Sequence, residues 1–150
     1  MAASTSGIAR GGFEVTMLPQ RSEDVPGGDP VGRLLLSKRF HGDLEATSHG
    51  QMLTATTRVE GSAGYVALER VSGTLGGRRG RFTLQHSGVM MRGDPRLVVE
   101  VVPDSGEEEL SGIAGTMEIV LADGVHSYEF RYTLPGPPEP PRPGFEADLR

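Results

Sequence analysis

The stretch "YVALERVSGTLGGRRGRFTLQHSG" (Tyr65–Gly88) contains two runs of alternating apolar and polar residues on either side of Gly76 and Gly77. Alternation with a period of two is typical of β-strands that are buried on one face. Two glycines between such runs indicate a tight hairpin turn. The stretch therefore predicts an antiparallel pair of strands. Each run also carries one titratable residue, Glu69 in the first and His86 in the second.

Similar alternating runs follow one another along most of the chain, and turn-forming residues separate nearly every pair. The first is "FEVTML" (Phe13–Leu18) and the last is "HSYEFRYTL" (His126–Leu134). Between them lie Gly32–Phe40, Leu44–Val59, Tyr65–Leu75, Arg81–Gly88, Leu97–Val102 and Thr116–Leu121. About eight strands joined mainly by hairpins predict an all-β fold, a single closed antiparallel barrel, because closure removes exposed strand edges.

One segment between the strands has a different pattern. "SGEEELSGIAG" (Ser105–Gly115) begins with a serine, continues with three glutamates and ends in glycine-rich sequence. A serine N-cap followed by acidic residues is typical of the first turn of a helix, and glycine is typical of its end. We therefore expect one short helical turn near residues 106–112.

The barrel is expected to span residues 13–134. Residues 1–12 are small and polar and lack periodicity, so we expect a flexible N-terminus. Residues 135–150 are rich in proline and are expected to form a flexible, extended tail.

Composition and charge exclude several classes of function. The chain has 150 residues, a net charge of −5 and no cysteine, so we expect one domain with neither thiolate chemistry nor electrostatic attraction to nucleic acid or anionic membrane. It lacks an apolar leader and any apolar run long enough to span a membrane, which indicates a cytoplasmic protein. The arginine-rich "GGRRGR" (Gly76–Arg81) precedes a strand, whereas a phosphate-binding loop precedes a helix. No metal site and no cofactor are expected, because the histidines lack ligand spacing.

The alternation predicts which side chains point into the barrel. In the last strand the aromatic face that includes His126 is interior, because the opposite face carries Glu129 and Arg131. In the run Tyr65–Leu75, either Glu69 or Arg70 must point inward. Burying a charge is costly without a partner. His86 across the hairpin can provide one for Glu69, so we place Glu69 inside.

These faces define a candidate site. Glu69, His86 and His126 are the candidate catalytic residues, because a carboxylate beside an imidazole in an apolar cavity can exchange protons near neutral pH. The interior also supplies the candidate ligand-binding residues Tyr65, Phe82, Leu84, Val99, Tyr128 and Phe130. The alternative interpretation is a satisfied polar network that fixes the register of the barrel.

Four segments carry a resemblance to a known family. They are "HGDLEATSHG" (His41–Gly50), Tyr65–Gly88, "VVPDSGEEELSGIAG" (Val101–Gly115) and His126–Leu134. With them the chain resembles the DUF3224 family, bacterial proteins with a domain of unknown function whose fold is similar to allene oxide cyclase and lipocalin-type barrels. The chain departs from the family pattern at Gly76 and Glu107. The resemblance implies a barrel with an apolar lumen and supplies no catalytic residues.

Two functions remain open. In the first, the lumen folds a hydrophobic substrate, such as a secondary metabolite, into a reactive conformer, and the protein is a cofactor-independent cyclase or isomerase. In the second, the protein is a non-catalytic carrier or sensor of a lipophilic ligand. Both predict a hydrophobic small molecule as the partner, without nucleic acid or membrane, and both leave open whether the chain forms a homo-oligomer.

Overall fold

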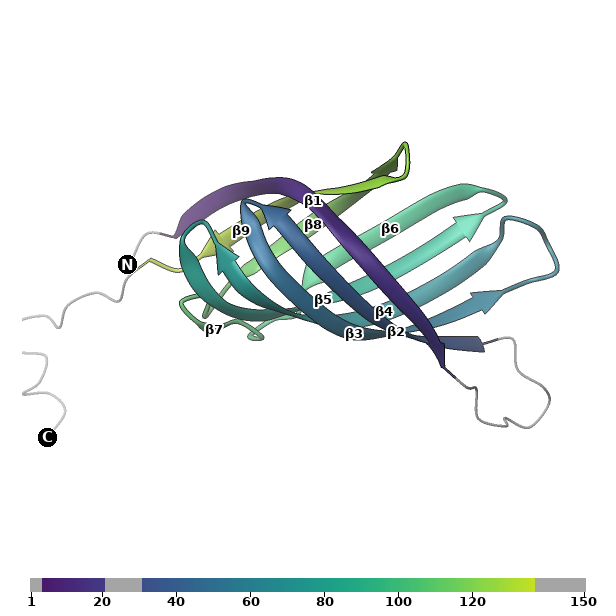
Figure 1. Ribbon diagram of the computed structural model, residues 1–150, viewed down its shortest axis with the longest axis horizontal. Helices are drawn as coiled ribbons and strands as arrows, with labels where there is room; N and C mark the ends of the chain where they lie inside the picture. The colour runs from purple at the N-terminus through teal and green to yellow at the C-terminus, as the bar shows by residue number, and fades with distance from the viewer. Residues whose placement is uncertain (1–3, 21–30, 137–150) are drawn as a thin grey trace, which may run out of the picture.

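The computed structural model describes residues 4–20 and 31–136, and it is a closed antiparallel β-barrel with one additional short strand (Figure 1). The predicted all-β fold is therefore confirmed. The strands are β1 (Thr5–Gln20), β2 (Val31–Gly42), β3 (Leu44–Thr56), β4 (Ala63–Leu75), β5 (Arg78–Met91), β6 (Asp94–Val101), β7 (Glu107–Glu108), β8 (Ala114–Ala122) and β9 (Val125–Leu134).

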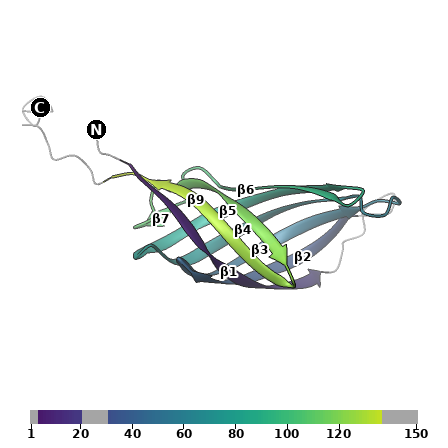
Figure 2. The ribbon, with the colours of Figure 1, turned by 90° about the horizontal axis from the view of Figure 1, so that it is seen from above.

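The strands follow one another around the barrel, and β9 pairs with β1 to close it (Figure 2). β7 lies outside this circuit and pairs with β5. The pairing between β6 and β8 is much shorter than the other strand pairings around the barrel. Between β6 and β8 the register contains a single residue pair, Glu100 with Thr116, whereas β3 and β4 pair continuously from Leu44–Leu75 to Thr56–Ala63.

Glycines form the hairpin turns that the sequence predicted. Gly76 and Gly77 connect β4 to β5 with φ angles of 55° and 83°. Asp123 and Gly124 connect β8 to β9 with φ angles of 52° and 76°. Two successive positive φ angles match the right-handed twist of the flanking strands, and glycine adopts them without steric cost. The arginines of "GGRRGR" all belong to β5.

The barrel begins earlier than the sequence indicated. β1 starts at Thr5, and residues Thr5–Phe13 pair with β9 from Leu134 to His126. The prediction of a flexible N-terminus is therefore wrong for residues 5–12. Their small side chains obscured the alternation, although Ala9 is buried in the core. The predicted proline-rich tail lies outside the described residues from 137 onward.

The predicted helical turn near residues 106–112 is wrong as a helix. The segment contains β7 followed by hydrogen-bonded turns, such as the amide of Leu110 to the carbonyl of Glu107 at 3.1 Å. Glu108 has a φ of 58°, a conformation that cannot continue a right-handed helix. No helix is present in residues 4–20 and 31–136.

The glutamates of this segment bind neighbouring strands. Glu107 forms an ion pair with Arg70 at 2.6 Å, and Glu108 lies 3.7 Å from Arg81. The side chain of Glu109 accepts a hydrogen bond from the amide of Arg79. These partners are distant in sequence, so the local pattern resembled a helix start.

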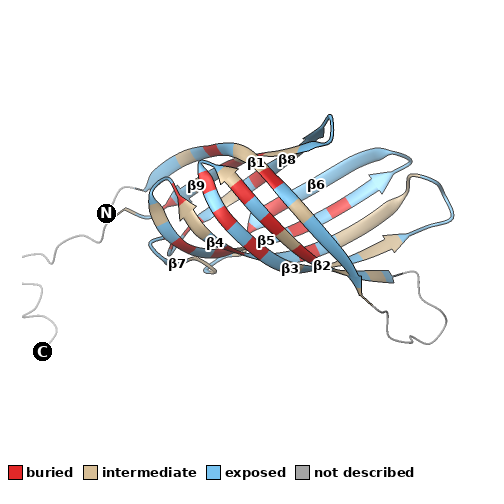
Figure 3. Ribbon diagram, viewed as in Figure 1, coloured by how far each residue is buried: buried red, intermediate tan, exposed pale blue. Residues whose placement is uncertain are grey.

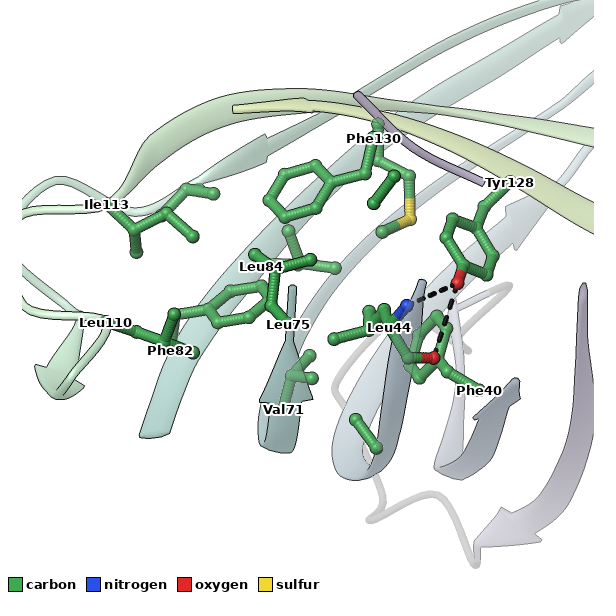
Figure 4. Packing of buried hydrophobic residues seen from close by; sticks show 14 of the residues in the cluster. Phe40, Leu44, Val71, Leu75, Phe82, Leu84, Leu110, Ile113, Tyr128 and Phe130 are labelled. Atoms are coloured by element: carbon green, nitrogen blue, oxygen red, sulfur yellow. Dashed lines mark hydrogen bonds between the residues drawn. The ribbon is translucent and has the colours of Figure 1, made fainter. Parts of the chain in front are cut away.

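The hydrophobic core fills the half of the barrel that carries β7. Figure 3 shows buried residues gathered there, while the far ends of β4, β5 and β6 are exposed or partly exposed. Side chains from opposite walls meet in this half, as Phe82 and Phe130 do with ring centroids 5.6 Å apart. Figure 4 labels Phe40, Leu44, Val71, Leu75, Phe82, Leu84, Leu110, Ile113, Tyr128 and Phe130.

Tyr128 links this core to the turn between β2 and β3. Its hydroxyl accepts a hydrogen bond from the amide of Leu44 at 2.9 Å (Figure 4). It also donates one to the carbonyl of His41 at 2.9 Å. Leu110 and Ile113, from the segment after β7, cover the end of the same core. The described residues include no helix that is long and apolar enough to cross a membrane.

Leu110 should be essential for closing this end of the barrel. It is 0% exposed, so Leu110→Ala should lower the free energy of unfolding by about 2–5 kcal/mol, because it leaves a cavity in the core. Leu68→Ala is the matched control, since Leu68 is 54% exposed and its loss should change stability by less than about 0.5 kcal/mol. Urea unfolding measures both. Equal small effects would show that the segment after β7 does not seal the core.

Candidate functional site

Glu69 is the centre of the candidate site. It lies in the middle of β4, where alternation turns it inward, and it is 0% exposed. Arg70 is exposed and paired with Glu107 on the outside. The predicted choice of inner face for this strand is therefore confirmed. Gly50 on β3 lies opposite Glu69, and a side chain at Gly50 would collide with the backbone of β4.

The Glu69 carboxylate accepts three hydrogen bonds from three different strands. His86 Nε2 on β5 lies 2.6 Å from Oε1, and Lys38 Nζ on β2 lies 2.8 Å from the same atom. Ser48 Oγ on β3 lies 2.6 Å from Oε2. We call these four side chains the polar cluster. All four are buried, and no buried side-chain nitrogen or oxygen in the described part of the chain lacks a partner.

The cluster keeps Glu69 ionised. Burial alone raises the pKa of its carboxyl group. The hydrogen bond from His86 and the positive charge of Lys38 oppose this effect and outweigh it, so that the pKa of Glu69 falls to about 2. A carboxylate with so low a pKa and three donors is a poor proton acceptor at neutral pH. Its three hydrogen bonds orient the side chains around it, and its negative charge balances that of Lys38.

Lys38 and Ser48 belong to the site but were not among the predicted site residues. Lys38 is the single lysine of the sequence and is 8% exposed. Its Nζ lies 4.8 Å from the centre of the Phe13 ring and 5.8 Å from that of Phe40. The signal was present in the alternation, because Lys38 shares a face with Leu36 and Phe40. A charge on an otherwise apolar face indicates a buried partner.

A cavity of about 110 Å³ adjoins the polar cluster on the side away from the core. Four polar side chains line it: Lys38, Tyr65, His86 and His126. Its apolar lining residues are Phe13, Val15, Met17, Leu36, Met52, Leu97 and Ile119. Glu69 does not line the cavity and lies behind the basic side chains that contact it.

Tyr65 occupies space that a glycine leaves free. Gly88 pairs with Tyr65 across the hairpin, and a Cβ atom there would lie 2.4 Å from the Tyr65 ring. Burial and, to a lesser extent, the negative charge of Glu69 raise the pKa of the Tyr65 hydroxyl. Tyr65 therefore remains a neutral phenol that can donate a hydrogen bond into the cavity.

His126 lies on the cavity wall but outside the hydrogen bonds of the polar cluster. Its ring stacks on Phe13 with centroids 4.9 Å apart, and Phe13 in turn lies beneath Lys38. The structure thus brings Glu69 and His86 into contact, as predicted, and places His126 at the same cavity without direct contact to Glu69. The catalytic roles of the three residues stay predictions.

Most of the candidate ligand-binding residues lie in the packed core. Tyr65 lines the cavity, whereas the others are buried among apolar neighbours: Phe82, Leu84, Val99, Tyr128 and Phe130. The lumen is therefore filled over much of its length, and the space for a small molecule lies on the side of the polar cluster away from the core. In the described ranges, no group of three or more His, Cys, Asp or Glu side chains could hold a metal ion.

Fold and site together define a closed β-barrel with a buried ionic cluster beneath a small, mostly apolar cavity. The family model described as "Protein of unknown function (DUF3224)" matches residues 9–132, so the chain belongs to the DUF3224 family. A solved structure from Shewanella oneidensis MR-1, described as a protein of unknown function from this family, is 47% identical. The match covers 91% of this chain and 99% of that chain, with a TM-score of 0.81. Curated proteins give no match.

The Lys38–Glu69 pair should show strong energetic coupling. Lys38→Met or Glu69→Leu alone leaves a buried charge without its partner and should cost about 3–5 kcal/mol, and the double change should cost clearly less than the sum. The exposed pair of Arg70 and Glu107, at 2.6 Å, is the matched control, with an expected coupling below about 1 kcal/mol. Double-mutant cycles by urea unfolding compare the two. Additive effects at Lys38 and Glu69 would contradict the buried pair.

The stability of the barrel should depend on pH through Glu69. Its pKa is about 2 in the folded state against 4.5 ordinarily, so its contribution is complete above pH 4.5 and is lost as the pH falls toward 2. At about 1.4 kcal/mol per pH unit, the contribution is about 3 kcal/mol. Unfolding of the wild type and Glu69→Gln at pH 7, 4.5 and 3 tests this. The difference in unfolding free energy between the two proteins should narrow below pH 4.5. A difference that stays constant from pH 7 to pH 3 would contradict the low pKa of Glu69.

Proposed function

We propose that this protein binds a hydrophobic small molecule in the cavity beside the polar cluster and acts on it as a cofactor-independent isomerase or cyclase. The observation that carries the proposal is the position of the cluster: a buried lysine, glutamate and histidine lie under a cavity with an apolar wall. Cavities of this composition, with a few convergent polar groups, are typical of binding and active sites.

The energetic cost of the cluster supports a functional role. Taking charged groups out of water costs several kcal/mol for each ion, and replacing a buried ion pair with apolar residues of similar volume is often neutral or stabilising. The rest of the core consists of apolar side chains that pack without such groups. Stability alone therefore gives little reason for Lys38, Glu69 and His86 to lie inside the barrel.

His86 is the group best placed to transfer a proton. Glu69 accepts a hydrogen bond from its Nε2, which fixes the ring and leaves Nδ1 as the free nitrogen. In the described residues Nδ1 has no hydrogen-bond partner. Because no fully buried nitrogen in that part of the chain is unpaired, Nδ1 must reach accessible space, and His86 lines the cavity. Glu69 then acts as a positioning residue rather than as the base.

The proposed reaction is a proton transfer at carbon. His86 Nδ1 removes a proton from a carbon next to a carbonyl, the C–H electron pair moves toward the carbonyl oxygen, and hydrogen bonds from Lys38 and Tyr65 stabilise the negative charge on that oxygen. In a substrate with a second double bond between its β- and γ-carbons, return of the proton from His86 to the γ-carbon shifts that double bond next to the carbonyl group and completes an isomerisation without oxidant, reductant or cofactor. The apolar wall, which includes Leu36 and Ile119, holds the chain of the substrate in one conformation.

A flexible ketone such as 2-octanone provides a direct test. In D₂O, NMR should show exchange of the protons next to its carbonyl, faster with the protein than with buffer alone. His86→Phe should reduce the protein-dependent rate roughly a hundredfold or more, since general-base catalysis typically contributes that much. The control is Gln85→Ala, because Gln85 is exposed on the outer face beside His86 and should leave the rate unchanged.

Binding is measured in the same samples by saturation-transfer NMR. Binding without exchange would favour the non-catalytic carrier, because a carrier needs the cavity and no base. Exchange that is equal in wild type and His86→Phe would contradict the role of His86. Absence of both binding and exchange would contradict the proposed function.

A further inference from the structure

The polar wall of the cavity contains hydrogen-bond donors and no carboxylate. Lys38, Tyr65, His86 and His126 supply its nitrogen and hydroxyl groups, and the remaining lining residues are apolar. The carboxylate of Glu69 is turned away and is already bound by three donors. A ligand that satisfies this wall must therefore bring hydrogen-bond acceptors.

The donors have unused capacity. Lys38 Nζ carries three N–H groups, and its one hydrogen bond in the described residues goes to Glu69. The Tyr65 hydroxyl has no hydrogen-bond partner in that part of the chain, and its side chain lines the cavity. Buried polar groups are normally paired, so several unpaired donors around one cavity point to a ligand or water that completes them.

The charge balance favours an anionic acceptor. With His86 neutral, Lys38 and Glu69 cancel each other. The Lys38 ammonium group lines the cavity and the Glu69 carboxylate lies behind it, so an entering carboxylate meets the positive charge first. The ionisable groups around His86 come from three strands. Glu69 and Tyr65 lie on β4, Lys38 lies on β2 on the other side of the Glu69 carboxylate, and His126 lies on β9 at the same cavity. Apart from Glu69, none of these carries a negative charge that would oppose a bound anion.

We propose that the cavity binds a small apolar carboxylate, with its carboxylate on Lys38 and Tyr65 and its hydrocarbon chain against Met17, Met52 and Leu97. This inference rests on the proposed function, since it names the chemical class of molecule for the same cavity. A cavity of about 110 Å³ is smaller than the 150 Å³ or so of an engineered cavity that binds benzene. It encloses the head group and the first carbons, and the chain continues toward Met17, which is exposed, and Met52, which is partly exposed.

Isothermal titration of the full chain with octanoate and 1-octanol at pH 7 tests the class. The two ligands share a chain and differ in the head group. Octanoate should bind roughly tenfold or more tightly, because hydrogen bonds to a charged group are the stronger ones. Hexanoate should bind more weakly than octanoate by about fourfold for each methylene that octanoate buries.

Two variants locate the head group. Lys38→Met should abolish the preference for octanoate over 1-octanol. Arg39 is the neighbour of Lys38 and lies on the outer face of β2, so Arg39→Met also removes one positive charge but should keep that preference. Tyr65→Phe should weaken the binding of octanoate several-fold and leave the binding of 1-octanol unchanged. This variant keeps the test decisive if Lys38→Met does not fold. Two results would overturn the inference while 2-octanone still binds. One is equal affinity for octanoate and 1-octanol, and the other is an equal loss of octanoate affinity in Lys38→Met and Arg39→Met. Failure of all three ligands to bind would overturn the proposed function as well.

Discussion

The carboxylate of Glu69, with three hydrogen bonds inside a closed barrel, is the interaction on which the site depends. Through Lys38, Ser48 and His86 it connects β2, β3 and β5 to its own strand, β4. A buried carboxylate with fewer donors would become protonated or move into water. The four side chains therefore have to lie at one level of the barrel, and this requirement fixes the register of four adjacent strands from the inside.

The polar cluster also divides the lumen. On one side, aromatic and aliphatic side chains fill the barrel, and the segment with Leu110 and Ile113 covers its end. On the other side, the walls carry exposed residues such as Met17 and Leu97, and the packing leaves a cavity. The first half contributes the apolar burial that stabilises the fold. That stabilisation allows the second half to contain the charged side chains of the polar cluster and an unfilled cavity.

The arrangement separates two roles that a single carboxylate cannot combine. A carboxylate that is to act as a base needs a raised pKa, and Glu69 has a lowered one because His86 and Lys38 hold its charge. The same contacts point the basic groups toward the cavity. The negative charge of Glu69, which lies behind the cavity wall, therefore holds hydrogen-bond donors on the side of the wall that faces the cavity. This explains why both proposals assign ligand contact to Lys38 and Tyr65, and why the proposed reaction gives Glu69 a positioning role.

The sequence by itself determined the strands, their turns and the closed antiparallel barrel, because alternation and glycine turns are local signals. It also indicated Glu69 and His86, since each interrupts an apolar face. It failed at residues 105–115, where a serine and three glutamates imitated a helix start although their partners lie on β4 and β5. Only the tertiary structure decided that Lys38 and Ser48 complete the cluster and that most of the lumen is filled. Those facts depend on which inward-facing side chains meet across neighbouring strands. This in turn depends on the register of each strand pair, which no single segment of the chain encodes.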